Sequence, residues 1–350
     1  MKEVFEDFSI TRVYSDSKWD ILWSHNYPFT NRTARGAWLK KLPNDKRVNK
    51  IPGSGFLSSK QSLAKIKDYK YFPKAFVLPS DWQKFAKERQ ETPDSYWLLK
   101  SGRHRNIRVV QSDEILNDEK EKFIQKMISP PLLINGRKFD IGTYVVLAQG
   151  EPLRVFLLDE WLIRFCNTGK YKIAIGNTTH KILSDYYPFD PLNPKQYVVG
   201  DDYTPIWEID DLKPYYENKI GMKRTLFSYL TTIGINPKTL ENTMESAIRD
   251  IWELQQPKMR KILKKYKNFP GQFFELFRMD WVIDEDANLF LLEVNMSPNL
   301  SSDHFPPNAQ LYRLVILSVG PLAQKSLETI IFCRSSSNII LDMCLRICFN

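Results

Sequence analysis

The stretch FFELFRMDWVIDEDANLFLLEVN, Phe273–Asn295, decides the fold of this chain. It contains two apolar runs, FRMDWVI and LFLLEVN, on either side of the turn-forming residues Asp284–Asn288. Two β-rich runs separated by a short polar turn are typical of a β-hairpin. The last strong structural signal of the chain is therefore an antiparallel strand pair, and polar side chains on those strands are held in a defined register.

The register of this hairpin predicts a metal site. If the turn is centred between Asp286 and Ala287, Asp280 lies directly opposite Glu293. Glu293 and Asn295 share one face, because side chains alternate along a strand. Two opposed carboxylates repel unless a cation lies between them, and oxygen ligands of this number suit Mg²⁺. Ordinary exposed hairpin charges are the alternative, but the apolar flanks of Glu293 favour burial and a magnesium site.

The rest of the chain predicts an α+β protein. Two β-rich runs, Lys138–Ala148 and Pro152–Phe165, predict a second hairpin. A long amphipathic helix is expected at Thr239–Lys265, broken or kinked at Pro257. Shorter strands are expected upstream, at Lys74–Leu78, Ser95–Lys100 and Ile107–Val110. Because strands and helices do not alternate strictly, antiparallel sheets are favoured over a doubly wound fold.

The amino-acid composition limits the kinds of binding partner that can be expected. The 350 residues include 50 Lys and Arg against 41 Asp and Glu, a formal net charge of +9. This excess favours an acidic partner, although a merely solvated basic surface is about equally compatible with it. No nucleic acid is expected, since the chain carries no signature of an RNA- or DNA-binding module.

The location expected from the sequence is the cytoplasm. No stretch reaches 18 apolar residues, so no membrane span is predicted. The first residues, MKEVFEDFSITRVYSD, lack the apolar region of a signal peptide. The four cysteines form no paired motif, which favours a reducing compartment.

The segment LLEVNMSPNL, Leu291–Leu300, with RMDWVIDED before it, resembles the C-terminal signature of the tubulin–tyrosine ligase-like family. Further segments resemble that family in the same order, at Trp19–Phe29, Val48–Gly53, Phe72–Trp82, Ile124–Ile128 and Pro131–Leu147. The resemblance implies an ATP-grasp fold with mixed and antiparallel sheets and a small N-terminal domain. The domains would be an N-terminal domain (1–66), a central ATP-grasp domain (67–125), a C-terminal ATP-grasp domain with the metal hairpin (126–320) and an atypical tail (321–350).

The resemblance also implies roles for individual residues. Asp280, Glu293 and Asn295 would hold the Mg²⁺ that bridges the ATP phosphates. Lys100 would bind phosphate as a point charge at the end of a strand. The other nucleotide-binding residues implied are the adenine hinge, Gln125, Lys126, Met127 and Ile128, and the pair Lys138 and Asp140. The catalytic residues expected are Lys100, Arg105 and Glu293.

Three segments depart from the family pattern. The loop after Lys100, SGRHRNI, has one glycine where the family has several, and Arg105 with its basic neighbours could supply the missing phosphate contact by charge. Gly142 stands where the family has an arginine for a substrate carboxylate. The family's His-Leu-Thr-Asn segment is not recognisable within 167–211, which contains His180. From Ser326 onward the chain matches nothing expected of the family.

Two functions follow from the resemblance. The first is an ATP-dependent ligase that adds an amino acid, glutamate above all, to glutamate side chains of an acidic tubulin tail through an acylphosphate. Such an enzyme would associate with the cytoskeleton, and a basic surface would speed its encounter with the tail. The second is a pseudoenzyme that binds nucleotide or microtubules without ligation, which Gly142 and the missing His-Leu-Thr-Asn segment favour. The paired carboxylates oppose the second function, because an idle site has no need of them.

Overall fold

The computed structural model describes residues 19–29, 37–66, 69–101, 107–110, 114–116, 120–167, 189–217, 221–266, 271–323 and 345–347. Arg105, His180 and most of the tail after Ser326 therefore lie outside the described residues.

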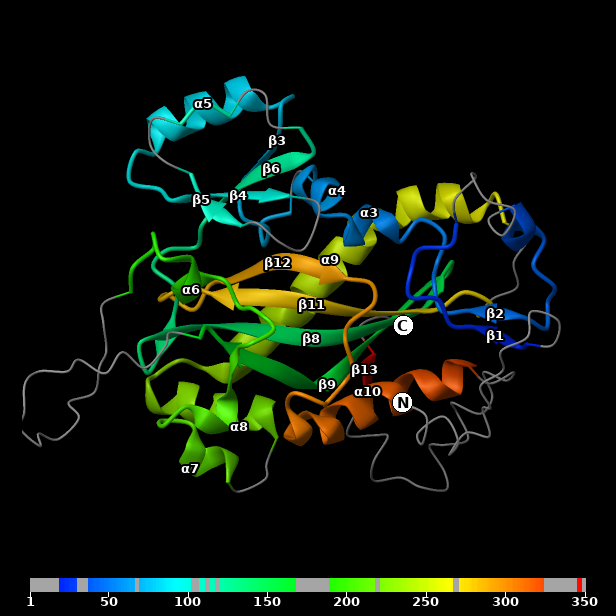
Figure 1. Ribbon diagram of the computed structural model, residues 1–350. Helices are drawn as coiled ribbons and strands as arrows, with labels where there is room; N and C mark the ends of the chain where they lie inside the picture. The colour runs from blue at the N-terminus through cyan, green and yellow to red at the C-terminus, as the bar shows by residue number, and fades with distance from the viewer. Residues whose placement is uncertain are drawn as a thin grey trace, which may run out of the picture.

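A large antiparallel sheet forms the centre of the molecule (Figure 1). Its strands follow the order β10-β9-β8-β11-β12, and the long hairpin β8–β9 lies beside the hairpin β11–β12. The strands are β8 (Arg137–Gly150), β9 (Leu153–Phe165), β10 (Thr204–Pro205), β11 (Glu275–Ile283) and β12 (Leu289–Asn295), with the short β7 (Leu133–Ile134) on β8 and β13 (Leu345–Ile347) on β9. Both hairpins expected from the sequence are thus confirmed.

A second, four-stranded sheet lies above the β12 edge of the large sheet (Figure 1). Its order is β3-β6-β4-β5, and α5 (Trp82–Glu91) covers it through Phe85, which is fully buried against Phe76 and Trp97. The strands are β3 (Ala75–Val77), β4 (Trp97–Ser101), β5 (Arg108–Val109) and β6 (Lys122–Lys126). Two antiparallel sheets with helices confirm the predicted fold class; the predicted domain boundaries remain predictions.

The helix α9 (Pro237–Leu263) runs along the face of the large sheet turned away from the viewer (Figure 1). It begins with Asn236, whose side chain accepts a hydrogen bond from the N–H of Lys238. Its apolar stripe packs on the sheet, where Trp252 meets Phe277 edge to face with ring centroids 5.2 Å apart. The helix continues through Pro257, so the predicted break does not occur there.

The remaining helices surround the large sheet. They are α3 (Gly55–Ser58), α4 (Lys60–Ala64), α6 (Pro194–Tyr197), α7 (Lys213–Tyr216), α8 (Met222–Thr232) and α10 (Ala309–Ala323), with short 3-10 turns at Leu39–Lys41, Ile206–Glu208 and Pro306–Asn308. The N-terminal strands β1 (Ile21–Leu22) and β2 (Arg47–Val48) pair in parallel. The helix α4 contacts β3, β6 and β12, and so connects the two sheets. Within the described ranges, no helix has the length and apolarity that crossing a membrane requires.

Candidate active site

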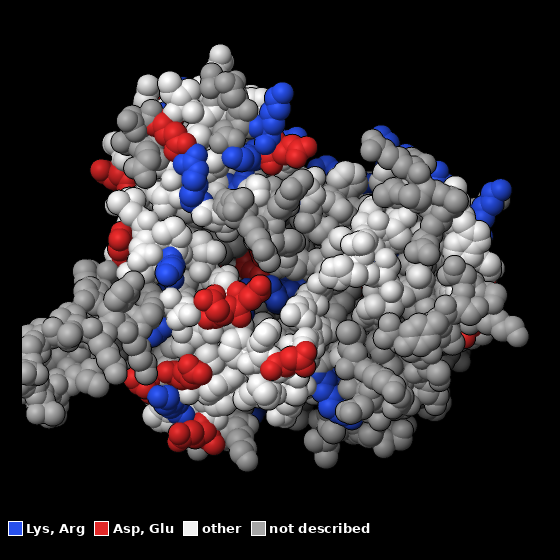
Figure 2. All heavy atoms as spheres, viewed as in Figure 1, with Lys and Arg blue, Asp and Glu red and all other residues white. Residues whose placement is uncertain are grey.

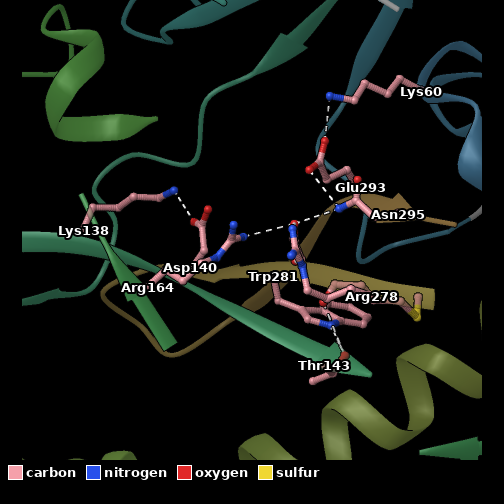
Figure 3. Close-up of polar contacts among 11 residues, drawn as sticks. Lys60, Lys138, Asp140, Thr143, Arg164, Arg278, Trp281, Glu293 and Asn295 are labelled. Carbon is pink, nitrogen blue, oxygen red and sulfur yellow. Dashed lines mark hydrogen bonds and ion pairs between the residues drawn. The ribbon is translucent and has the colours of Figure 1, made fainter. Parts of the chain in front are cut away.

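The face of the large sheet opposite α9 collects charged side chains from four neighbouring strands. Asp280 lies opposite Glu293 on β12 and opposite Gly142 on β8, while Asp140 on β8 lies opposite Arg164 on β9. Because side chains alternate along each strand, residues two apart on these strands point to the same side. The charged members of this face are Lys138, Asp140, Arg164, Arg278, Asp280 and Glu293, with Asn295 beside them (Figure 3).

The predicted pairing of Asp280 with Glu293 is confirmed, although the turn differs from the one assumed. Ile283 pairs with Leu289, so the turn is centred on Asp286 rather than beyond it. A bulge between Asp280 and Trp281 then shifts the register by one residue and brings Asp280 back opposite Glu293.

Asn295 joins the two carboxylates at a single point. Its Nδ2 donates to Asp280 Oδ2 over 2.9 Å and to Glu293 Oε1 over 3.0 Å. A cation in the place of this amide nitrogen would therefore have a carboxylate oxygen on each side. No group of three or more His, Cys, Asp or Glu at metal-binding spacing occurs among the described residues, so the candidate ligands are two carboxylates and one amide. This sparse oxygen set fits Mg²⁺, which keeps several positions for water and phosphate.

Two arginines cover Asp280, whose exposed fraction is 2%. Arg278 donates from Nε to Oδ1 over 2.7 Å and from Nη2 to Oδ2 over 2.9 Å. The Nη2 of Arg164 lies 3.1 Å from the same Oδ2. Burial opposes the charge of Arg278, but Asp280 outweighs burial and raises the pKa of the guanidinium. Arg278 therefore remains a cation in the cleft, the space above this face of the large sheet into which Lys60 also reaches.

Lys60, the first residue of α4, reaches Glu293 from outside the sheet (Figure 3). Its Nζ lies 2.7 Å from Glu293 Oε2. Burial alone would raise the pKa of Glu293, but Lys60 and the hydrogen bond from Asn295 lower it well below its usual range. These contacts therefore favour the anionic form of Glu293.

Lys100 extends from β4 toward the same cleft and is almost completely buried. Burial lowers the pKa of its amine to about 8. The negative charge of Glu293 raises this pKa, and the positive charge of Lys60 lowers it further. Its Nζ donates to Gln125 Oε1 on the neighbouring strand over 2.5 Å. The Nε2 of Gln125 is buried and has no partner among the described residues, which suits a residue beside a ligand.

Lys138 and Asp140 form a buried ion pair on β8, as their spacing of two predicts (Figure 3). Burial opposes the charge of Lys138, but Asp140 raises the pKa of the amine above its usual value. The Nζ of Lys138 also lies 4.8 Å from the ring centre of Tyr197, a cation–π contact.

The predicted adenine hinge runs from the end of β6 toward the large sheet. The N–H of Lys126 donates to Lys74 O and the N–H of Met127 donates to Tyr96 O, each over 2.8 Å. The N–H of Ile128 donates to the hydroxyl of Tyr197 over 3.1 Å. The ring of Tyr197 packs with Leu98, Val109 and Met127, so an aromatic side chain lies in the apolar slot beside the hinge.

The site carries more positive than negative charge. Its cations are Lys60, Lys100, Lys138, Arg164 and Arg278, against the three anions Asp140, Asp280 and Glu293. A polyanion such as a nucleotide triphosphate would meet this excess in a recess of low dielectric. Among the described residues elsewhere on this side of the molecule, acidic and basic side chains are interspersed (Figure 2).

Four of these residues escaped the sequence analysis: Lys60, Arg164, Arg278 and Tyr197. Arg278 could have been found, because it stands two residues before Asp280 on one strand and so shares its face. Arg164 could not, because its pairing with Asp140 depends on two irregularities in the β8–β9 register. Of the predicted catalytic residues, the structure brings Lys100 and Glu293 together, and Arg105 lies outside the described residues.

Sequence comparisons relate this chain to known proteins. The sequence profile of the tubulin-tyrosine ligase family matches residues 39–319. The "Probable tubulin polyglutamylase ttll-15" of Caenorhabditis elegans is 40% identical over 88% of this chain and 57% of its own length. The "Tubulin monoglutamylase TTLL4" of Mus musculus is 26% identical over 85% of this chain and 24% of its own. The "Tubulin polyglutamylase TTLL5" of Homo sapiens is 28% identical over 83% and 22%. The chain thus spans between about a fifth and three fifths of the length of these relatives.

Proposed function

Because the chain belongs to the tubulin-tyrosine ligase family, we propose that it is an ATP-dependent ligase that adds glutamate to glutamate side chains of tubulin. The observation that carries the proposal is the pairing of Asp280 with Glu293, which brings two carboxylates and a cluster of cations to one face of the large sheet. The names of the relatives support tubulin as the acceptor and glutamate as the added amino acid. A location at microtubules in the cytoplasm follows from that acceptor.

The residues in the cleft would have three roles in this reaction. Lys100 and Lys138 would hold the triphosphate and offset the charge that builds on the transferring phosphoryl group. Asp280, Glu293 and Asn295 would hold Mg²⁺, which neutralises phosphate charge when bound. The burial of Lys100, Lys138 and Asp280 would keep water from the activated carboxylate.

The proposed reaction has two steps. An acceptor carboxylate oxygen attacks the γ-phosphorus of ATP, and the bond to the leaving ADP breaks, which gives an acylphosphate. The amine of the incoming glutamate then attacks the acyl carbon, loses a proton and expels inorganic phosphate. One ATP is consumed for each amide bond formed.

The test is incorporation of radiolabelled glutamate into purified tubulin with MgATP, beside a titration of MgATP binding. Incorporation that disappears in Glu293→Gln supports the ligase. The alternative, a pseudoenzyme, predicts tight MgATP binding with no incorporation of glutamate, tyrosine or glycine, and that result would overturn the proposal. The pseudoenzyme is the less favoured of the two, because the relatives are named for glutamylation.

A further inference from the structure

Gly142 lies in the middle of β8, at the point of the cleft where Asp280 faces it from β11. Its backbone does not have a positive φ, so conformational freedom does not explain a glycine here. A Cβ at this position would lie 3.0 Å from Cδ and 3.4 Å from Cγ of Arg278. These contacts are tighter than most real Cβ contacts, so the side chain of Arg278 uses the space that Gly142 leaves open.

Arg278 thereby carries its guanidinium into the cleft from the neighbouring strand. Figure 3 shows that Arg164, Arg278 and Asn295 reach the same region from three different strands. The side chain of Arg278 is only 13% exposed, and both of its observed hydrogen bonds go to Asp280. Arg164 contacts the same carboxylate, and its buried Nε has no partner among the described residues.

Binding of a metal ion at Asp280 would leave these guanidinium groups without their full complement of anion contacts. A buried cation that loses its counter-ion is strongly destabilised, so a second anion should take the place of Asp280. The planar fork of arginine matches a carboxylate through two parallel hydrogen bonds. The reaction proposed above uses two carboxylate-bearing molecules, the incoming glutamate and the acceptor chain.

We propose that Arg278 is a specificity-determining residue that binds a substrate carboxylate, and that Gly142 is the space that admits it. This inference rests on the proposed ligase function. The carboxylate belongs either to the incoming amino acid or to the acceptor chain, and the chemistry of recognition is the same for both. The space between β8 and β11 at this point admits one long side chain. Arg278 on β11 is that side chain, and Gly142 on β8 leaves the space open for it.

The experiment compares Arg278→Gly, Gly142→Arg and the transposed double variant Gly142→Arg/Arg278→Gly with the unmodified chain. Arg278→Gly should lower kcat/KM for one carboxylate substrate by about tenfold to a hundredfold, as expected for a lost charged hydrogen bond, while KM for ATP changes far less. The transposed variant should recover most of that loss. Arg278→Lys should have a lower kcat/KM than the transposed variant, because lysine lacks the planar fork of arginine. A rise in KM for glutamate assigns the carboxylate to the incoming amino acid, and a rise in KM for tubulin assigns it to the acceptor.

The matched control is Arg260→Ala. Arg260 forms a similar two-bonded pair with Glu151 on the exposed side of α9, far from the cleft, and its loss should leave both KM values unchanged. Thermal unfolding of each variant identifies Gly142→Arg molecules that fail to fold around the crowded Arg278. Unchanged KM values in a folded Arg278→Gly, or an equal loss for ATP, would overturn the inference.

A binding measurement separates this inference from the proposed function. Glutamate is titrated into the MgADP-loaded protein, with and without Arg278→Gly, and no turnover is needed. Binding that depends on Arg278 in a chain that incorporates nothing would retain the inference and refute the ligase. If Arg278→Gly still ligates, with unchanged KM values for glutamate and tubulin, the ligase function is retained and the inference about Arg278 is refuted.

Discussion

The peptide N–H of Ile128 donates a hydrogen bond of 3.1 Å to the hydroxyl of Tyr197. Tyr197 is 3% exposed, and its ring packs against Met127 and beside Lys138. If adenine uses the hinge as proposed, its ring nitrogen and this hydroxyl compete for one donor. Tyr197 would then oppose nucleotide binding at the hinge.

The first prediction concerns this competition. Tyr197→Phe removes the competing acceptor and should raise the affinity for MgATP by about threefold to tenfold, the value of one neutral hydrogen bond. Titration calorimetry measures it. Tyr69→Phe is the matched control, because Tyr69 is also buried and donates to Ala247 O on α9, away from the hinge. Equal effects of the two substitutions, or weaker binding in Tyr197→Phe, would show that Tyr197 does not occupy the adenine position.

The second prediction concerns the protonation of Lys100. Its pKa of about 8 lies below the usual value because of burial, so the cation that phosphate requires is lost as pH rises through about 8. Affinity for MgATP should fall between about pH 7 and about pH 10. Lys100→Arg keeps its charge throughout this range and should flatten the profile. The same slope in both proteins would mean that another group controls binding.

The third prediction concerns the metal ligands. Glu293→Gln should weaken MgATP binding by about tenfold or more, while binding of ADP without metal changes little, since only the former uses the carboxylate. Both constants can be measured by titration in the presence and absence of a chelator. Glu285→Gln, in the exposed turn of the same hairpin, is the control and should change neither. An equal loss for both nucleotides would remove Glu293 from the metal site.

The fourth prediction concerns Glu275, a fully buried residue on β11 that faces Lys50. Burial raises the pKa of its carboxyl to about 7, although Lys50 and the N–H of Ile51 favour the anion. The folded state then holds a proton that the unfolded state releases near pH 4.5. The unfolding free energy should therefore fall as pH rises from about 4.5 to about 7, by up to about 3 kcal/mol.

Chemical denaturation at several pH values measures this slope. Glu275→Gln should remove it, because the amide does not titrate. Glu253→Gln, on the exposed side of α9, should retain it. A slope that persists in Glu275→Gln would assign the titration to a different group.

Sequence alone predicted the two hairpins, because each consists of two β-rich runs joined by a short turn, which is a local property of the sequence. The sequence also predicted that Asp280 pairs with Glu293, but from a turn position that differs from the observed one. The turn is displaced toward Asp286, and a bulge beside Trp281 compensates for the displacement. A bulge depends on packing against neighbouring strands, so the sequence of the hairpin did not reveal it.

What the sequence by itself determined is the two long hairpins and the shared face within each of them, which carries Lys138 and Asp140 in one hairpin and Asp280, Glu293 and Asn295 in the other, since side chains alternate along a strand. Tertiary structure decided which residues complete that face. Lys60 meets Glu293 from a helix, Tyr197 reaches the hinge from a distant segment, and Arg278 fills the space above Gly142. The physical reason is that these contacts join separate elements, and their geometry follows from how the two sheets and their helices pack rather than from any local pattern.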